Sequence, residues 1–139
     1  MSQDYTQTVR SFYEAFAARD TQRFAALLDP RIEWSAAENF LYADQSPYVG
    51  IDAVVNLIFG RLFSDWESFT MSPGEILGGG EVVIASGRFR GTSKASGAPI
   101  DAQFVQVFQF QANKIAKVQM YTDTAQFRET IARTRSSAT

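Results

Sequence analysis

The strongest constraint on the fold lies between residues 102 and 123, where two extended runs flank the segment Gln-Ala-Asn-Lys. In the first run the residues alternate in two sets, namely Phe104, Gln106, Phe108 and Phe110 against Gln103, Val105, Val107 and Gln109. A strict period of two is typical of a β-strand with one buried face, here the aromatic one. The four-residue break, which contains Asn113, predicts a hairpin. Gln106 is then a polar residue inside an aromatic wall, as in a small-molecule pocket.

The first half of the chain predicts helices around one short strand. Apolar residues at helical spacing predict an amphipathic helix over residues 4–19, and Asp20 is expected to cap a second, shorter one. Alternating residues predict a strand over 31–36, and turn-forming residues predict an irregular segment over 37–49. Asp52 is expected to cap a third helix.

The second half is expected to be mainly extended. Strands are predicted over 67–77, where Pro73-Gly74 indicates an edge position or a bulge, and over 81–92, after a turn at 78–80. A last helix follows Asp123. Helices and a run of antiparallel strands make an α+β fold, which we expect to be one curved antiparallel sheet wrapped around the N-terminal helices as a cone.

The composition excludes several classes of chemistry. The 139 residues include no His and no Cys, which rules out His-dependent triads, thiol nucleophiles, disulfides and metal sites built on these ligands. A net charge of −2 without a basic stripe argues against nucleic-acid binding. No apolar run reaches the ~20 residues of a membrane span, and no secretory signal pattern is visible. We therefore expect a cytoplasmic protein without metal or cofactor, with one domain over 1–135 and a disordered tail over 136–139.

Aromatic residues make up 14% of the chain, more than a packed core needs, and a lined cavity accounts for the excess. The predicted pocket wall comprises Phe12, Phe16, Trp34, Phe40, Tyr42, Trp66, Phe104, Gln106, Phe108, Met120 and Tyr121. Such a wall favours a small apolar or aromatic ligand whose oxygen accepts a hydrogen bond from Gln106. The same aromatic residues would also serve as ordinary core, and Gln106 as a strand amide satisfied by a neighbour. Tyr121 has the parity of Gln119, so it faces inward only if a bulge intervenes.

In the absence of His, proton transfer falls to carboxylates, Tyr or Lys. Glu38 lies in the irregular segment where a lid over the pocket is expected, and it is the best placed candidate for a general base. Asp123 is the second candidate catalytic residue, although a helix N-cap is the better explanation of its position.

Five segments of the chain resemble one known superfamily: SFYEAFAARD, IEW, GIDAVVNLIFGRL, GRFRGTSKASG and NKIAKVQMYTDT. They resemble the SnoaL-like branch of the ketosteroid-isomerase-like (nuclear transport factor 2-like) superfamily, and the match spans about residues 8–131. The resemblance implies a cone-shaped α+β barrel, commonly a homodimer formed through the outer sheet face. The catalytic positions of the steroid isomerases correspond here to Phe12, Trp34 and Gln106, none of which titrates, so the isomerase mechanism is not expected.

Two functional classes remain open. One is a cofactor-independent isomerase, cyclase or lyase that acts on a small apolar carbonyl compound, with Glu38 or Asp123 moving the proton. The other is a non-catalytic binding or dimerisation module of the same fold. In either case Val105 and Val107 form an outward strip that suits a sheet-on-sheet homodimer contact.

Overall fold

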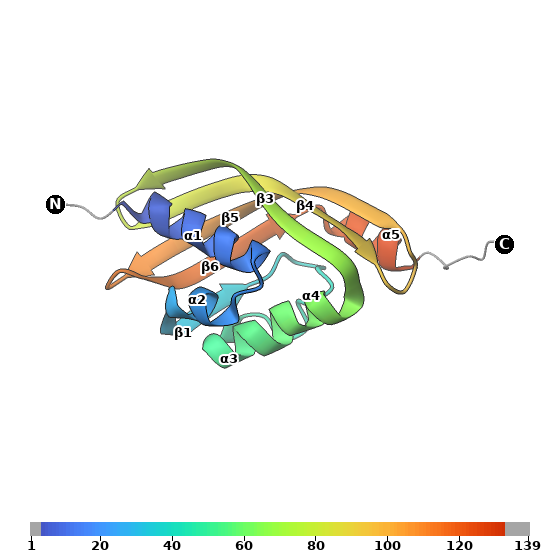
Figure 1. Cartoon of the computed structure of the whole chain (residues 1–139), viewed down its shortest axis with the longest axis horizontal. Coiled ribbons are helices and arrows are strands. Elements are labelled where there is room, and N and C mark those ends of the chain that lie inside the picture. The colour runs from blue at the N-terminus through green and yellow to red at the C-terminus, as the bar shows by residue number, and fades with distance from the viewer. Residues whose placement is uncertain (1–3, 133–139) are drawn as a thin grey trace.

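The computed structural model describes residues 4–132, so the predicted tail at 136–139 and the domain end at 135 lie outside the described residues. Over this range a six-stranded sheet with the order β2-β1-β6-β5-β4-β3 curves around the helices (Figure 1). The strands are β1 (Leu28–Ser35), β2 (Tyr48–Val49), β3 (Trp66–Gly79), β4 (Val82–Ser93), β5 (Pro99–Gln111) and β6 (Lys114–Thr122). The helical elements are α1 (Tyr5–Ala17), α2 (Thr21–Ala26), α3 (Ile51–Ala53), the π-helical stretch η1 (Val54–Phe59), α4 (Gly60–Asp65) and α5 (Thr124–Ala132). The predicted α+β cone is confirmed.

One strand pair differs from the expected antiparallel sheet. β1 runs parallel to β6, while the other neighbouring strands pair antiparallel. A parallel pair requires a long connection, and the segments between β1 and β6 provide one. β1 also begins at Leu28, before the predicted start at residue 31, and its pairing with β6 is interrupted between Leu28 and Glu33. Pro30 lies in this interruption, where its missing N–H removes no ladder hydrogen bond.

The central hairpin has the predicted parity. On β5 the side chains of Phe104, Gln106 and Phe108 are buried, while Val105 and Val107 are half-buried on the other face. The β5–β6 turn is tighter than the four-residue break suggested, because Gln111 pairs with Lys114. Its two central residues, Ala112 and Asn113, have φ angles of 49° and 68°, the left-handed backbone that two-residue hairpin turns favour.

The helix caps agree with the sequence in two places and differ in one. Asp20 accepts a hydrogen bond from the backbone N–H of Arg23 at 3.1 Å, and Asp123 accepts one from Gln126 at 3.2 Å, so both predicted caps are confirmed. Asp52 does not cap the third helix. That helix begins at Ile51 after Gly50, whose φ of 96° favours glycine, and Asp52 lies in its first turn.

The edge strand β3 carries the expected irregularity. Its register with β4 shifts between Pro73 and Glu75, which is the bulge that Pro73-Gly74 predicted. The strand runs on to Gly79, so the turn predicted at 78–80 begins only at Gly80, which has a φ of 63°. Triple glycine permits a turn but does not force one at its first residue.

The last helix closes one end of the cone. Phe127 of α5 is fully buried, with its ring centroid 4.9 Å from that of Phe40 and 5.8 Å from that of Trp66. Beside it, Arg128 donates a hydrogen bond from Nε to the backbone oxygen of Asn39 at 2.6 Å. The C-terminal helix and the loop after β1 therefore meet over the interior, and aromatic rings fill the space between them.

The buried face of β5 gives a direct test of this packing. Phe108→Asp places a carboxylate without a partner at a position with 0% exposure, so we expect the domain to unfold. Gln109→Asp is the matched control, since Gln109 is exposed on the same strand and the change should leave the thermal midpoint nearly unchanged. Circular dichroism melts compare the two. A soluble Phe108→Asp protein with the parent midpoint would show that the parity is wrong.

Candidate functional site

A phenol and an amide meet inside the cone. Gln106 of β5 is 1% exposed, and its Oε1 accepts a hydrogen bond from the hydroxyl of Tyr13 on α1 at 2.6 Å. The helical phase that buries Phe12 and Phe16 also turns Tyr13 toward the sheet. Burial raises the pKa of Tyr13 well above its ordinary value. The phenol is therefore neutral near pH 7 and serves as a hydrogen-bond donor.

The other end of the Gln106 amide lacks a strong partner. Within residues 4–132, its Nε2 contacts the sulfur of Met71 at 3.9 Å, and a thioether is a weak acceptor. Gln106 lines an internal cavity of about 20 Å³. A cavity of that size holds about one water molecule. The amide N–H groups thus border a small internal space with no oxygen acceptor among the described residues.

All the predicted wall residues except Tyr121 separate into three groups. Those that line the cavity are Trp34, Phe40, Tyr42, Gln106 and Met120. Those that are buried in the aromatic packing around it are Phe12, Trp66, Phe104 and Phe108. Phe16 lines a separate groove on the helix side. The aromatic wall therefore serves partly as cavity lining and partly as core, and both interpretations of the sequence apply to different residues.

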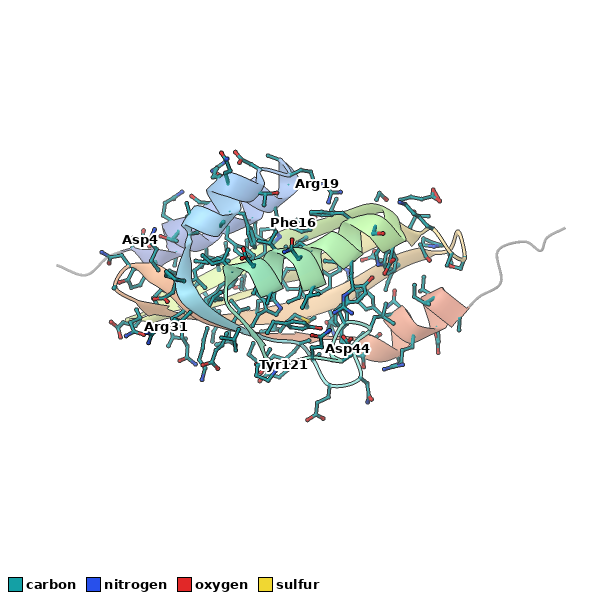
Figure 2. The ribbon with its side chains drawn as sticks, turned by 90° about the horizontal axis from the view of Figure 1, so that it is seen from below. Asp4, Phe16, Arg19, Arg31, Asp44 and Tyr121 are labelled. Carbon is teal, nitrogen blue, oxygen red and sulfur yellow. The ribbon has the colours of Figure 1, made fainter. Side chains whose placement is uncertain are left out.

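Tyr121 lies outside the interior. Its side chain is 54% exposed on the outer face of the sheet, on the side away from α1 (Figure 2). The reason is its parity on β6: Met120 and Val118 are buried, and no bulge intervenes between them and Tyr121. Its assignment to the pocket wall is corrected accordingly.

Neither candidate base reaches the cavity. Glu38 is exposed in the turn after β1, where Ala37 and Phe40 take the inward positions. Asp123 is exposed at the start of α5 and borders an open depression on the outer face, together with Tyr121. The structure therefore does not bring the two predicted carboxylates together with Gln106.

A different carboxylate contacts the cavity wall through a phenol. Tyr42 donates a hydrogen bond from its hydroxyl to Oδ2 of Asp65 at 2.8 Å and accepts one from Nε1 of Trp66 at 3.2 Å. Burial, together with the bond to Asp65, raises the pKa of Tyr42. Tyr42 is therefore also neutral near pH 7, and its hydroxyl proton points to Asp65.

The loop that carries Tyr42 is tied to α4 by a charged cluster. Arg61 forms an ion pair with Asp44 at 3.1 Å, and its Nη2 donates to the hydroxyl of Tyr48 at 2.6 Å. Hydrogen bonds from Arg61 and Tyr48 lower the pKa of Asp44 to about 2. Asp44 stays ionised at neutral pH, and the cluster fixes the loop at the side of the cavity.

Sequence reasoning missed two residues of the interior. Tyr13 stands among the apolar residues of its helix. A Tyr on a buried face needs a partner for its hydroxyl, and this signal could have identified it. Met71 gave no signal, because its inward direction depends on the register of β3 with β4.

Two negative findings apply to residues 4–132. No cluster of three or more Asp, Glu, His or Cys side chains is arranged to hold a metal ion. Over the same range, the helices are too short or too polar to cross a membrane.

The Tyr13–Gln106 bond predicts non-additive stability changes. Tyr13→Phe leaves Oε1 of Gln106 unpaired and Gln106→Leu leaves the Tyr13 hydroxyl unpaired, so each should lower the free energy of unfolding by roughly 1–3 kcal/mol. The double variant should lose less than the sum, because it removes both partners. Denaturant unfolding measures the cycle, with Tyr5→Phe at an exposed hydroxyl as the control. Additive losses would show that the two groups do not interact.

Solved structures of other proteins share this fold. An NTF2-like protein from Burkholderia thailandensis E264 has 26% identity, with 93% of this chain and 98% of that chain covered and a TM-score of 0.86. An NTF2-like protein of unknown function from Burkholderia pseudomallei K96243 has 26% identity, with 94% and 98% covered and a TM-score of 0.85. TerC, co-crystallised with polyporic acid, has 20% identity, with 90% and 95% covered and a TM-score of 0.79.

The amino-acid sequence was also compared with curated proteins and with models of protein families. No curated protein matches the chain. The model described as the SnoaL-like domain matches residues 9–118, which include both members of the Tyr13–Gln106 pair. The chain therefore belongs to the SnoaL-like family.

Proposed function

We propose that this protein binds a small, mostly apolar molecule that carries a carbonyl or hydroxyl oxygen, and that Gln106 donates a hydrogen bond to that oxygen. The observation that carries the proposal is the Gln106 Nε2 group, which is buried at a cavity with a thioether as its acceptor. A buried amide without a good partner costs roughly 1–3 kcal/mol. A ligand oxygen would recover this free energy.

Binding requires side chains to move. Ligand pockets usually measure about 300–1,000 Å³, whereas the cavity beside Gln106 measures about 20 Å³. Met71 and Met120 line it, and Met side chains change rotamer easily and fit irregular shapes. Their displacement would give an apolar ligand part of the space it needs.

The comparisons support a small-molecule ligand. The SnoaL-like family match covers both elements of the amide–phenol pair, and TerC, which shares the fold, was crystallised with polyporic acid. The interior of this chain supplies neutral polar groups from Gln106, Tyr13 and Tyr42 rather than charges. That chemistry favours a neutral buried portion of the ligand and disfavours a phosphate.

A second candidate function is a cofactor-independent isomerase, cyclase or lyase. The observation that favours it is the hydrogen bond from Tyr42 to Asp65, which joins a carboxylate to a phenol on the cavity wall. In such a reaction the Tyr42 oxygen would accept a proton from the substrate while its own proton passes to Asp65. Glu38 and Asp123 do not line the cavity, so they are not placed to take that part.

The binding proposal is tested by calorimetry with 2-acetylnaphthalene, naphthalene and 2-naphthyl phosphate. We expect the ketone to bind and the phosphate ester to be rejected. Gln106→Leu should weaken the ketone by about 1–3 kcal/mol and leave naphthalene unchanged or tighter. Gln109→Leu, on the exposed face of the same strand, is the matched control. Tight binding of 2-naphthyl phosphate, or an affinity for the ketone that Gln106→Leu does not change, would contradict the proposal.

We also propose a homodimer through the outer face of the sheet. Val105 and Val107 are half-buried there, and the neighbouring strands add Ile84, Leu77 and Tyr121 with exposures of 42%, 60% and 54%. Ile84 pairs with Val107 and with Leu77, so these residues form one continuous apolar row. A two-fold sheet-on-sheet contact would cover this row.

The dimer is tested by changing the centre of that row. Ile84→Lys places a charge where two copies would meet, and we expect it to convert the dimer to a monomer in light scattering. Gln7→Lys is the matched control, since it adds the same charge at an exposed position on α1. A parent protein that stays monomeric at high concentration would contradict the proposed homodimer.

A further inference from the structure

An apolar groove of about 200 Å³ lies between the end of α1, the start of α2 and the η1–α4 segment. Its floor is aromatic, formed by Phe16, Phe24, Phe59 and Phe63, and its polar rim is formed mainly by Arg19, Asp20 and Asn56. We propose that this groove is a second part of the binding site, which takes the carboxylate end of an aryl carboxylic acid. The inference rests on the proposed function, because the other end of that ligand would reach Gln106.

Arg19 gives the groove a charge that can recognise a carboxylate. Its guanidinium carbon lies 3.9 Å from the ring centroid of Phe63 and 5.7 Å from that of Phe16, and Figure 2 shows Arg19 and Phe16 close together beside the helices. Within residues 4–132 Arg19 forms no ion pair, and the neighbouring Asp20 accepts from the backbone of Arg23. A guanidinium held over aromatic rings with its N–H groups free is suited to bind a carboxylate side-on.

The backbone at Arg19 supports a role for this side chain. Arg19 has a φ of 58°, and the N–H of Asp20 donates to the carbonyl of Ala15 at 3.0 Å, which closes the C-terminus of α1. Glycine is the usual residue at such a left-handed position. An Arg at this position has a less favourable backbone conformation than Gly. Its contacts with Phe63 and Phe16 at the groove are consistent with a functional role for the side chain.

Phe59 is the wall between the groove and the internal cavity. It lines both spaces, and its ring centroid lies 5.3 Å from that of Phe16 on the groove side and 5.4 Å from that of Trp34 on the cavity side. Phe59 is the last residue of the π-helical stretch η1, and π-helical turns are frequent at functional sites. Displacement of the Phe59 ring would join the groove to the cavity. The joined space would give a ligand more room beside Gln106 than the cavity alone.

These observations define the ligand class. Aromatic walls on both sides of Phe59 favour a flat apolar body, and Gln106 favours an oxygen acceptor at the inner end. Among residues 4–132 no Lys or Arg is buried in the interior, so we place the anionic group of the ligand at the groove, beside Arg19. The predicted ligand is an aryl monocarboxylate with a second, neutral oxygen far from the carboxylate.

The experiment uses 4′-hydroxybiphenyl-4-carboxylate and its neutral carboxamide as probes, with calorimetry on the full chain. We expect the carboxylate to bind about two- to five-fold tighter than the carboxamide, as an exposed ion pair gives. Arg19→Gln should abolish this difference. Gln106→Leu should weaken both probes about five-fold or more, through the hydroxyl at the inner end.

Blocking variants test the groove itself. Gly60 lines the groove and has ordinary helical geometry, and an added Cβ would meet only the Val55 carbonyl oxygen, at 3.5 Å. Gly60→Leu should fill the groove and weaken both probes at least ten-fold, while Gly60→Ala is the matched control and should leave them unchanged. Asn56→Trp, at an exposed position of the same wall, is a second blocking variant if Gly60→Leu fails to fold.

The outcomes separate the two proposals. Sensitivity to Gln106→Leu together with indifference to Arg19→Gln and to the blocking variants would overturn the groove and leave the proposed function standing. Sensitivity to the groove variants without any effect of Gln106→Leu would overturn the proposed function and the connection through Phe59. Absence of binding by either probe would overturn both.

Discussion

The structure depends on the placement of one polar side chain in an aromatic interior. Gln106 sits at the middle of the inward face of β5, between Phe104 and Phe108, and its carbonyl oxygen is satisfied by Tyr13 from the helix layer. That bond restricts the depth and the rotation of α1 against the sheet, because both partners are buried and losing the bond would cost free energy. Ring contacts from Tyr13 to Phe104 and Phe108 then follow from the same position of the helix.

The distribution of charge limits the chemistry that this interior can perform. Ionised groups surround it at the rim, as in the cluster of Arg61 and Asp44 and in the ion pair of Arg88 with Asp101 on the outer face. Inside, Tyr13, Tyr42 and Gln106 are neutral at physiological pH. Such a site recognises oxygen atoms well and exchanges protons only where a phenol is bonded to a carboxylate, as Tyr42 is to Asp65.

Much of the fold could be predicted because period-two alternation and helical spacing are local signals. The inward set of β5, the caps Asp20 and Asp123 and the bulge at Pro73 all follow from neighbouring residues. The site was less predictable because its contacts are between distant segments. Tyr13 meets Gln106 across 93 residues of sequence, and Asp65 reaches Tyr42 from a helix end. For Tyr121 the local signal was correct and its assignment to the pocket was wrong, because its alternation with Met120 on β6 places it on the outer face.

The parallel pairing of β1 with β6 has a consequence for how the protein is made. Leu28 finds its partner only when Ile115 has been synthesised. Ribosomes add roughly 5–20 residues per second, so β1 waits several seconds after it is made. The apolar face of α1 is covered earlier, because it packs mainly against β3 and β4, which end at Ser93. Until β6 is made, the edge of β1 that faces β6 stays unpaired, and unpaired strand edges in a nascent chain are prone to aggregation.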